Sequence, residues 1–187
     1  MRHGNEYIEA LKPAAAKSVK WGFLRSAEIR PFPEVGKAAD HLELVGFMVD
    51  GNPMDSLKIR LSCGQIHSWL FRNLQVAGVN CAVTIGDVEV DGKLEYGTSY
   101  QKLKQEARGA HRDGTKPYPF HVWLTFPDLH IIDATFFVYK YWDRLPEPWK
   151  WSDYLICSDH PFAQDLNLRY VPMLVGDSDL IDGMIYK

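Results

Sequence analysis

The chain has 187 residues, of which 46% are hydrophobic and 24% charged, with a formal net charge of −3. This length and composition are typical of one globular domain with a buried core, and the charge gives no reason to expect a nucleic acid or an anionic membrane as partner. No segment approaches the roughly 18 consecutive apolar residues of a membrane span, and the N-terminus lacks the apolar run of a secretory signal. We therefore expect a cytoplasmic protein, although a protein exported by a non-classical route would look the same.

The first part of the chain is predicted to be mostly helical. Residues 5–11 have weak helical character, and Pro13 is expected to end or kink this helix before residues 14–20. Residues 21–33 are predicted to be extended or loop. Residues 34–49 form the next predicted helix, which ends at the strong turn signal of residues 50–53.

The next predicted helix begins beside a cysteine. Ser62 and Gln65 have the spacing of a capping box, which makes Ser62 the predicted N-cap and Cys63 the first helical residue. Gly78 follows the helix, where a left-handed residue is favoured. The buried face is predicted from residues that recur at intervals of three and four: Ile66, Trp69, Leu70, Leu74 and Ala77.

A thiol at a helix N-terminus lies close to unpaired backbone N–H groups and to the positive end of the helix dipole. This position lowers the pKa of a thiol and favours the nucleophilic thiolate. The chain has three cysteines and no C-x-x-C motif, which indicates reduced thiols rather than a disulfide framework. Cys63 is the candidate nucleophile, whereas Cys81 and Cys157 are expected to be structural.

Residues 79–90 are rich in β-branched side chains and are predicted to form a strand that ends at the turn Asp91-Gly92. Residues 98–108 have a helix-forming composition, and residues 109–119 are predicted to be a loop. Residues 102–116 carry a net positive charge. The favoured interpretation is a solvated surface, and the alternative is a patch that attracts an acidic partner.

Residues 120–126 and 130–138 are predicted to be the two strands of a β-hairpin. If residues 127–129 form a three-residue loop, His121 lies opposite Thr135, and Asp133 is its diagonal neighbour on the same face. Diagonal neighbours lie about 7–8 Å apart at the backbone, within reach of the two side chains. A two-residue loop would place them on opposite faces, so the register tests the prediction.

The remaining residues, from 139, are predicted to be rich in loops and aromatic side chains. Residues 169–175 are predicted to form a last strand despite Pro172, and an acidic, frayed end is expected from Gly176. The tryptophans of this part are expected to serve ordinary packing, and the alternative is a groove for an acyl donor: Trp142, Trp149 and Trp151.

Cys63, His121 and Asp133 together have the composition of a catalytic triad, in which the carboxylate orients the imidazole and the imidazolium stabilises the thiolate. Trp123 is expected to pack beside His121 and shield it.

His67 lies one helical turn after Cys63. It is expected to be a surface or partly buried histidine, with a supporting role near the site as the alternative. A metal site built from the cysteine and both histidines is conceivable, but zinc ligands usually lie closer in sequence, so we expect no metal or cofactor.

The pattern C-x(5)-W-L-x(3)-L-x(3)-G-V-x-C-x-V, followed by H-x-W and D-x-T, resembles the transglutaminase-like core of the papain-like cysteine enzymes. The resemblance spans about residues 60–137 and matches Cys63, then His121 with Trp123, then Asp133 with Thr135 to the family's triad pattern. It implies an α+β fold, in which N-terminal helices and the helix that starts at the cysteine pack on an antiparallel sheet. Two features depart from the family: an arginine motif after the helix is replaced by G-V-N-C-A, and no glutamine precedes the cysteine.

We therefore expect one domain over residues 1–187, with a core of about 54–138, a helical part at 1–53 and an aromatic part at 139–187. The expected activity is acyl transfer from protein or peptide amides, including glutamine side chains, through a thioester at Cys63. The backbone N–H of Cys63 is expected to help hold the oxyanion. Hydrolysis, as in a peptidase or deamidase, is favoured over transfer to an amine. The alternatives are a non-catalytic interaction domain on the same scaffold and a small-molecule N-acyltransferase.

Overall fold

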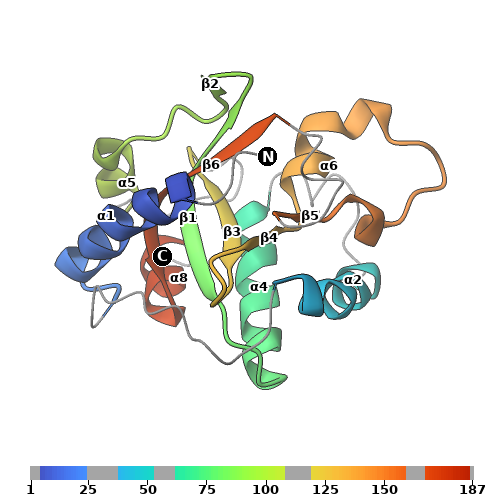
Figure 1. The fold of residues 1–187 in the computed structure, drawn as a ribbon, viewed down its shortest axis with the longest axis horizontal. Helices are drawn as coiled ribbons and strands as arrows, with labels where there is room; N and C mark the ends of the chain where they lie inside the picture. Colours follow the sequence, from blue (N-terminus) through green and yellow to red (C-terminus); the bar gives the residue numbers. More distant parts are fainter. Residues whose placement is uncertain (1–4, 25–37, 53–61, 108–118, 159–166, 186–187) are drawn as a thin grey trace.

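A computed structural model describes residues 5–24, 38–52, 62–107, 119–158 and 167–185 (Figure 1). Most of the predicted stretch 21–33, the start of the predicted helix 34–49, and nearly all of the loop 109–119 with its basic residues lie outside these ranges. The described residues form an α+β fold, which confirms the predicted class at this level. The fold centres on one six-stranded sheet in which every recorded pairing is antiparallel.

The sheet is built around its long strand β1. The order is β2-β1-β3-β4-β5, and β6 pairs with β1. The strands are β1 (Ala82–Val90), β2 (Lys93–Leu94), β3 (His121–Thr125), β4 (Ile131–Asp133), β5 (Ile156–Cys157) and β6 (Leu168–Gly176). Because β1 contacts both β3 and β6, residues of the C-terminal strand reach the same region as the predicted hairpin.

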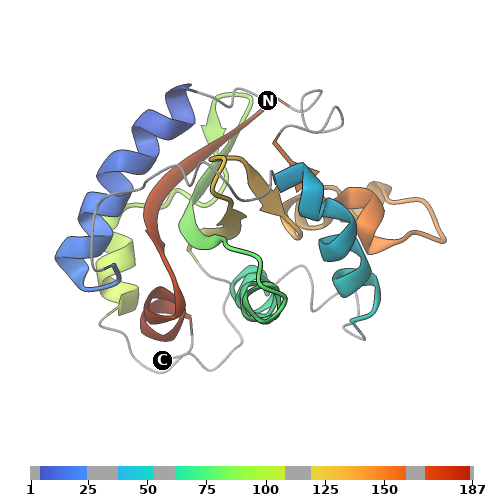
Figure 2. The ribbon, with the colours of Figure 1, turned by 60° about the horizontal axis from the view of Figure 1, so that its bottom comes forward.

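Helices cover the sheet on both sides, with α1 beside β6 and with α4 and α8 together on the other side (Figure 2). The buried apolar side chains accordingly form two clusters, one with the α4 residues and one with the α1 residues. The helices are α1 (Asn5–Trp21), α2 (Leu42–Asp50), α4 (Cys63–Val76), α5 (Tyr100–Ala107), α6 (Phe136–Tyr141) and α8 (Ser178–Met184), with 3-10 turns η1 (Ala38–His41), η2 (Trp142–Arg144) and η3 (Trp151–Tyr154).

Both ends of α4 lie where they were predicted. Ser62 is the N-cap and Cys63 the first helical residue, but the Ser62 side chain makes no capping hydrogen bond, so the predicted capping box is wrong. At the other end Gly78 has φ +76°. Its N–H donates to the carbonyl of Gln75 at 3.0 Å, and the N–H of Val79 donates to that of Leu74 at 2.9 Å. These two bonds are the Schellman motif that a glycine at this position favours.

The hairpin of β3 and β4 has the predicted register, because Leu124 pairs with Ile132 and Thr125 with Ile131. The turn closes through the N–H of Phe126, which donates to the carbonyl of His130 at 2.8 Å. Residues 127–129 are therefore the expected three-residue loop. The register places His121 and Asp133 on one face of the sheet.

The second hairpin strand is shorter than predicted. It ends at Asp133 instead of continuing to residue 138, and α6 begins at Phe136. The Oδ1 atom of Asp133 accepts hydrogen bonds from the N–H groups of Thr135 at 2.9 Å and Phe136 at 3.1 Å. This local bonding turns the chain into a helix, as an N-terminal capping carboxylate does. Thr135 is the N-cap of α6, so its predicted pairing opposite His121 is wrong.

The two ends of the described chain are more helical than predicted. Helix α1 runs through Pro13, although proline inside a helix costs about 3 kcal/mol. Burial of Tyr7, Leu11 and the following alanines against the sheet offsets this cost. The predicted frayed end contains α8, whose Leu180, Ile181 and Met184 are buried, so that prediction is wrong.

Gly86 on β1 is a position where a larger residue would collide with its neighbours, so that the surrounding structure would have to shift. It pairs with His121, and a Cβ there would lie 2.1 Å from the carbonyl oxygen of Val171 and 2.8 Å from the ring of Trp123. We expect Gly86→Ala to lower the free energy of unfolding by about 1–3 kcal/mol, the usual cost of overpacking. Thermal unfolding followed by circular dichroism measures this, with Gly51→Ala as the control because its Cβ would meet the nearest atom at 3.3 Å. Equal midpoints for the two variants would contradict the prediction.

Candidate active site

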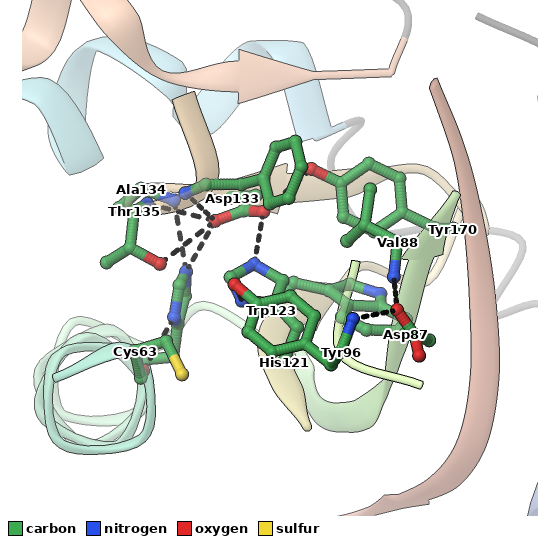
Figure 3. Close-up of polar contacts among 12 residues, drawn as sticks. Cys63, Asp87, Val88, Tyr96, His121, Trp123, Asp133, Ala134, Thr135 and Tyr170 are labelled. Atoms are coloured by element: carbon green, nitrogen blue, oxygen red, sulfur yellow. Dashed lines mark hydrogen bonds and ion pairs between the residues drawn. The ribbon is translucent and has the colours of Figure 1, made fainter. Parts of the chain in front are cut away.

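The buried carboxylate of Asp133 is the centre of the site (Figure 3). Its Oδ2 atom accepts hydrogen bonds from Nε2 of His121 at 2.6 Å and from the hydroxyl of Tyr170 at 2.7 Å. Its Oδ1 atom accepts the bonds from the start of α6. Burial alone would raise the pKa of Asp133, but the charge and hydrogen bond of His121 outweigh burial and hold that pKa well below its ordinary value. Asp133 is therefore an ionised carboxylate that fixes the proton of His121 on Nε2.

His121 begins β3 and is fully buried. Burial alone would lower the pKa of His121, but the charge and hydrogen bond of Asp133, with a further contribution from Cys63, raise it to about 10. The ring is stacked against Tyr96, with centroids 5.3 Å apart, and against Trp123 at 6.1 Å. The predicted packing of Trp123 beside His121 is confirmed. The aromatic walls fix the plane of the imidazole, and the bond to Asp133 fixes its rotation.

Cys63 is the first residue of α4, and its sulfur lies on the side of the helix that faces His121 (Figure 3). It keeps 9% of its surface exposed, whereas Cys157 is fully buried. The thiol contacts the backbone carbonyl of Phe120, the residue before His121, with Sγ and O 3.9 Å apart. The first helical hydrogen bond is donated by Ile66 to Ser62, so the N–H of Cys63 belongs to the first turn, where helical N–H groups have no acceptor within the helix.

His67 lies under the site as a buried neutral imidazole, so the prediction of a surface or partly buried histidine is wrong. Its Nδ1–H donates to the carbonyl of Cys63 at 2.8 Å, and its Nε2 accepts the N–H of Ala134 at 3.0 Å. Nε2 also lies 3.5 Å from Oδ1 of Asp133. Because that nitrogen uses its lone pair for Ala134, the contact is not an ion pair. Burial lowers the pKa of His67 to about 4, which agrees with the neutral form.

His67 therefore joins the start of α4 to the residue after Asp133, which is the supporting role that the sequence offered as an alternative. The conceivable metal site with Cys63 and His121 is not supported, since both ring nitrogens of His67 are bound to the backbone. Among the residues that the structure describes, no group of three potential ligands is placed to hold a metal ion.

Sequence reasoning missed two tyrosines of the site. Tyr170, on β6, donates to Asp133, and Tyr96, which follows β2, has its hydroxyl 3.2 Å from Nδ1 of His121. Neither lies near the triad residues in the chain. The alternation of β6 could have indicated that Tyr170 points into the sheet's core, but no local pattern marks Tyr96.

Other residues singled out in the sequence have structural roles. Thr135 contacts Asp133 through both its N–H at 2.9 Å and its hydroxyl at 3.3 Å. Trp151 is buried and donates its Nε1–H to the carbonyl of Ala134 at 2.5 Å, so it braces the segment after Asp133. Burial raises the pKa of the Cys81 thiol to about 12, which makes it a poor nucleophile at neutral pH.

Comparisons with protein-family models, with curated proteins and with solved structures gave no match to this chain. Within the described ranges, no helix has the length and apolar character needed to cross a membrane.

Proposed function

We propose that this protein is a cysteine-dependent enzyme that transfers acyl groups from amides through a thioester at Cys63. The observation that carries the proposal is the buried pair of His121 and Asp133, bonded at 2.6 Å, beside a cysteine at a helix N-terminus. The pair favours the imidazolium, and an imidazolium next to a thiol favours the thiolate. A binding domain has no need for this combination of charge, burial and geometry.

In the proposed reaction the Cys63 thiolate attacks the amide carbonyl carbon, and the carbon–oxygen π electrons move to the oxygen. The N–H of Cys63 donates a hydrogen bond to this oxyanion. As the carbon–nitrogen bond breaks, Nδ1 of His121 gives its proton to the leaving amine. Water then attacks the thioester, its proton passes to Nδ1, and the carbon–sulfur bond breaks to return the thiolate and release the acid.

We also propose that the protein is related to the transglutaminase-like enzymes. This is supported by the order of Cys63, His121 and Asp133 along the chain and by their positions at a helix start, on a strand and on the next strand in sequence. This resemblance favours protein or peptide amides as substrates, with hydrolysis ahead of transfer to an amine. An intact-mass search for an acyl-enzyme with glutamine peptides, protein substrates and small acyl donors would separate these classes.

The direct test is the rate at which iodoacetamide alkylates each cysteine, read by peptide mass spectrometry. We expect Cys63 to react fastest at pH 6–7, and His121→Ala to slow it by roughly tenfold or more, because an ordinary thiol with a pKa of about 8.5 is mostly protonated there. Cys81 and Cys157 are internal references in the same molecule. A Cys63 rate equal to theirs, and unchanged by His121→Ala, would contradict the enzyme and favour the non-catalytic interaction domain.

A further inference from the structure

The Tyr96 side chain occupies the nitrogen that the proposed reaction needs. Its hydroxyl lies 3.2 Å from Nδ1 of His121, and its ring is stacked on the imidazole at an interplanar angle of 16°. The Tyr96 ring is also stacked on Tyr139, with centroids 5.7 Å apart. The Tyr96 ring thus lies against the rings of both His121 and Tyr139, with its hydroxyl within hydrogen-bond distance of Nδ1.

The segment that carries Tyr96 is anchored by a buried carboxylate on β1. Asp87 accepts the N–H of Tyr96 at 3.1 Å, that of Thr98 at 2.7 Å and that of Val88 at 2.8 Å. The Thr98 hydroxyl is also 3.2 Å from the carbonyl of Gly86, the residue paired with His121. Because β1 also pairs with the strand of His121, this anchor fixes Tyr96 relative to the imidazole.

Nδ1 has a single position for a proton or a lone pair, and two side chains lie in front of it. The groups that face the imidazole are Asp133 at Nε2, the neutral His67 with ring centroids 6.2 Å apart, Cys63 and Tyr96, with Trp123 and Phe136 as aromatic walls. Tyr96 is hydrogen-bonded to Nδ1, and the Cys63 side chain also forms a hydrogen bond with the imidazole while its sulfur contacts the carbonyl of Phe120.

We infer that Tyr96 is a positioning residue that competes with the Cys63 thiol for Nδ1 of His121 and so limits the thiolate–imidazolium pair in the free protein. This inference rests on the proposed function and adds a residue that limits the reactivity of Cys63. In the restrained state the Nδ1–H of the imidazolium donates to the Tyr96 oxygen, and Cys63 is a thiol. In the reactive state Cys63 has released its proton to solvent, and the same Nδ1–H donates to the thiolate instead of to the tyrosine. Burial, followed by the charge of Cys63, raises the pKa of Tyr96 well above its ordinary value, so the hydroxyl keeps its proton.

Tyr96→Phe removes the hydroxyl and keeps the stacked ring. We expect the variant to alkylate at Cys63 roughly two- to tenfold faster at pH 6, the equivalent of one net hydrogen bond, with the acid limb of the pH–rate profile moved to lower pH. Tyr139→Phe is the matched control, because it removes the hydroxyl of a tyrosine whose ring is stacked on Tyr96. Its profile should match that of the unmodified protein.

An unchanged or slower Cys63 in Tyr96→Phe would overturn the inference while leaving the proposed function intact, provided that the unmodified protein shows fast alkylation dependent on His121. If alkylation of Cys63 in the unmodified protein does not depend on His121, the proposed function itself is contradicted. Asp87→Asn is a second variant that keeps the tyrosine and weakens its anchor. It should move the profile in the same direction, and a profile identical to that of the unmodified protein would count against the restraint.

Discussion

Asp133→Asn should slow the alkylation of Cys63 at pH 6 by roughly 10- to 100-fold, because at that pH an ordinary thiol is only about 0.3% ionised. The asparagine NH₂ group would face Nε2 of His121, which would then keep its lone pair there and carry its proton on Nδ1. That neutral tautomer has no charge with which to stabilise the thiolate of Cys63, so the effect of the imidazolium is lost.

The same substitution should lower the free energy of unfolding by about 3–5 kcal/mol, because it breaks a buried ion pair and removes the acceptor of the Tyr170 hydroxyl. For a chain of this size that corresponds to a fall of about 10 °C in the thermal midpoint. Asp153→Asn is the control, since Asp153 is exposed and the change of residue type is the same. If Asp133→Asn alkylates Cys63 as fast as the unmodified protein and has the same thermal midpoint, both parts of the prediction are contradicted.

The free energy of unfolding should be greatest near pH 6–7 and fall on both sides by a few kcal/mol. On the alkaline side, the pKa of His121 is about 10 in the folded protein and about 6.5 when unfolded, so its contribution is complete below pH 6.5 and is lost as the pH rises towards 10. The raised pKa of Cys81, about 12, adds to this loss above pH 9, where the unfolded thiol ionises.

On the acid side two groups act in the same direction. The pKa of His67 falls to about 4 on folding, so its contribution is complete above pH 6.5 and is lost as the pH falls towards 4. The lowered pKa of Asp133 adds a loss below about pH 4. Urea unfolding between pH 4 and 9 measures the profile. His121→Gln should flatten the alkaline limb and His67→Gln the part between pH 6.5 and 4, and limbs that keep their slopes in these variants would refute the assignment.

Short sequence patterns correctly predicted several parts of the site. The start of α4 at Cys63, the left-handed Gly78 and the three-residue turn each depend on a few neighbouring residues. The turn alone set the register that brings His121 to Asp133. Where a single side chain changes the local preference, prediction failed: Asp133 bonds to the two backbone N–H groups that follow and ends its strand.

The contacts that sequence reasoning missed join residues far apart in the chain. Tyr170 reaches Asp133 because β6 returns to pair with β1, and His67 is buried because its ring joins α4 to the residue after β4. A helical pattern alone could not distinguish a histidine on the surface from one with both nitrogens bound. Helix α1 shows the same limit, since packing against the sheet overrides the cost of Pro13.

The hydrogen bonds that converge on Asp133 come from β3, from β6 and from the start of α6. The carboxylate that orients the base is therefore also a junction of the tertiary structure. Selection for folding would preserve Asp133, and with it the buried charge of His121, even in a descendant that no longer catalysed anything. Under the proposed function, loss of activity in such a lineage would be recorded at Cys63, whose thiol has a contact of 3.9 Å to one backbone carbonyl, so the identity of that residue would be the better indicator of a working enzyme.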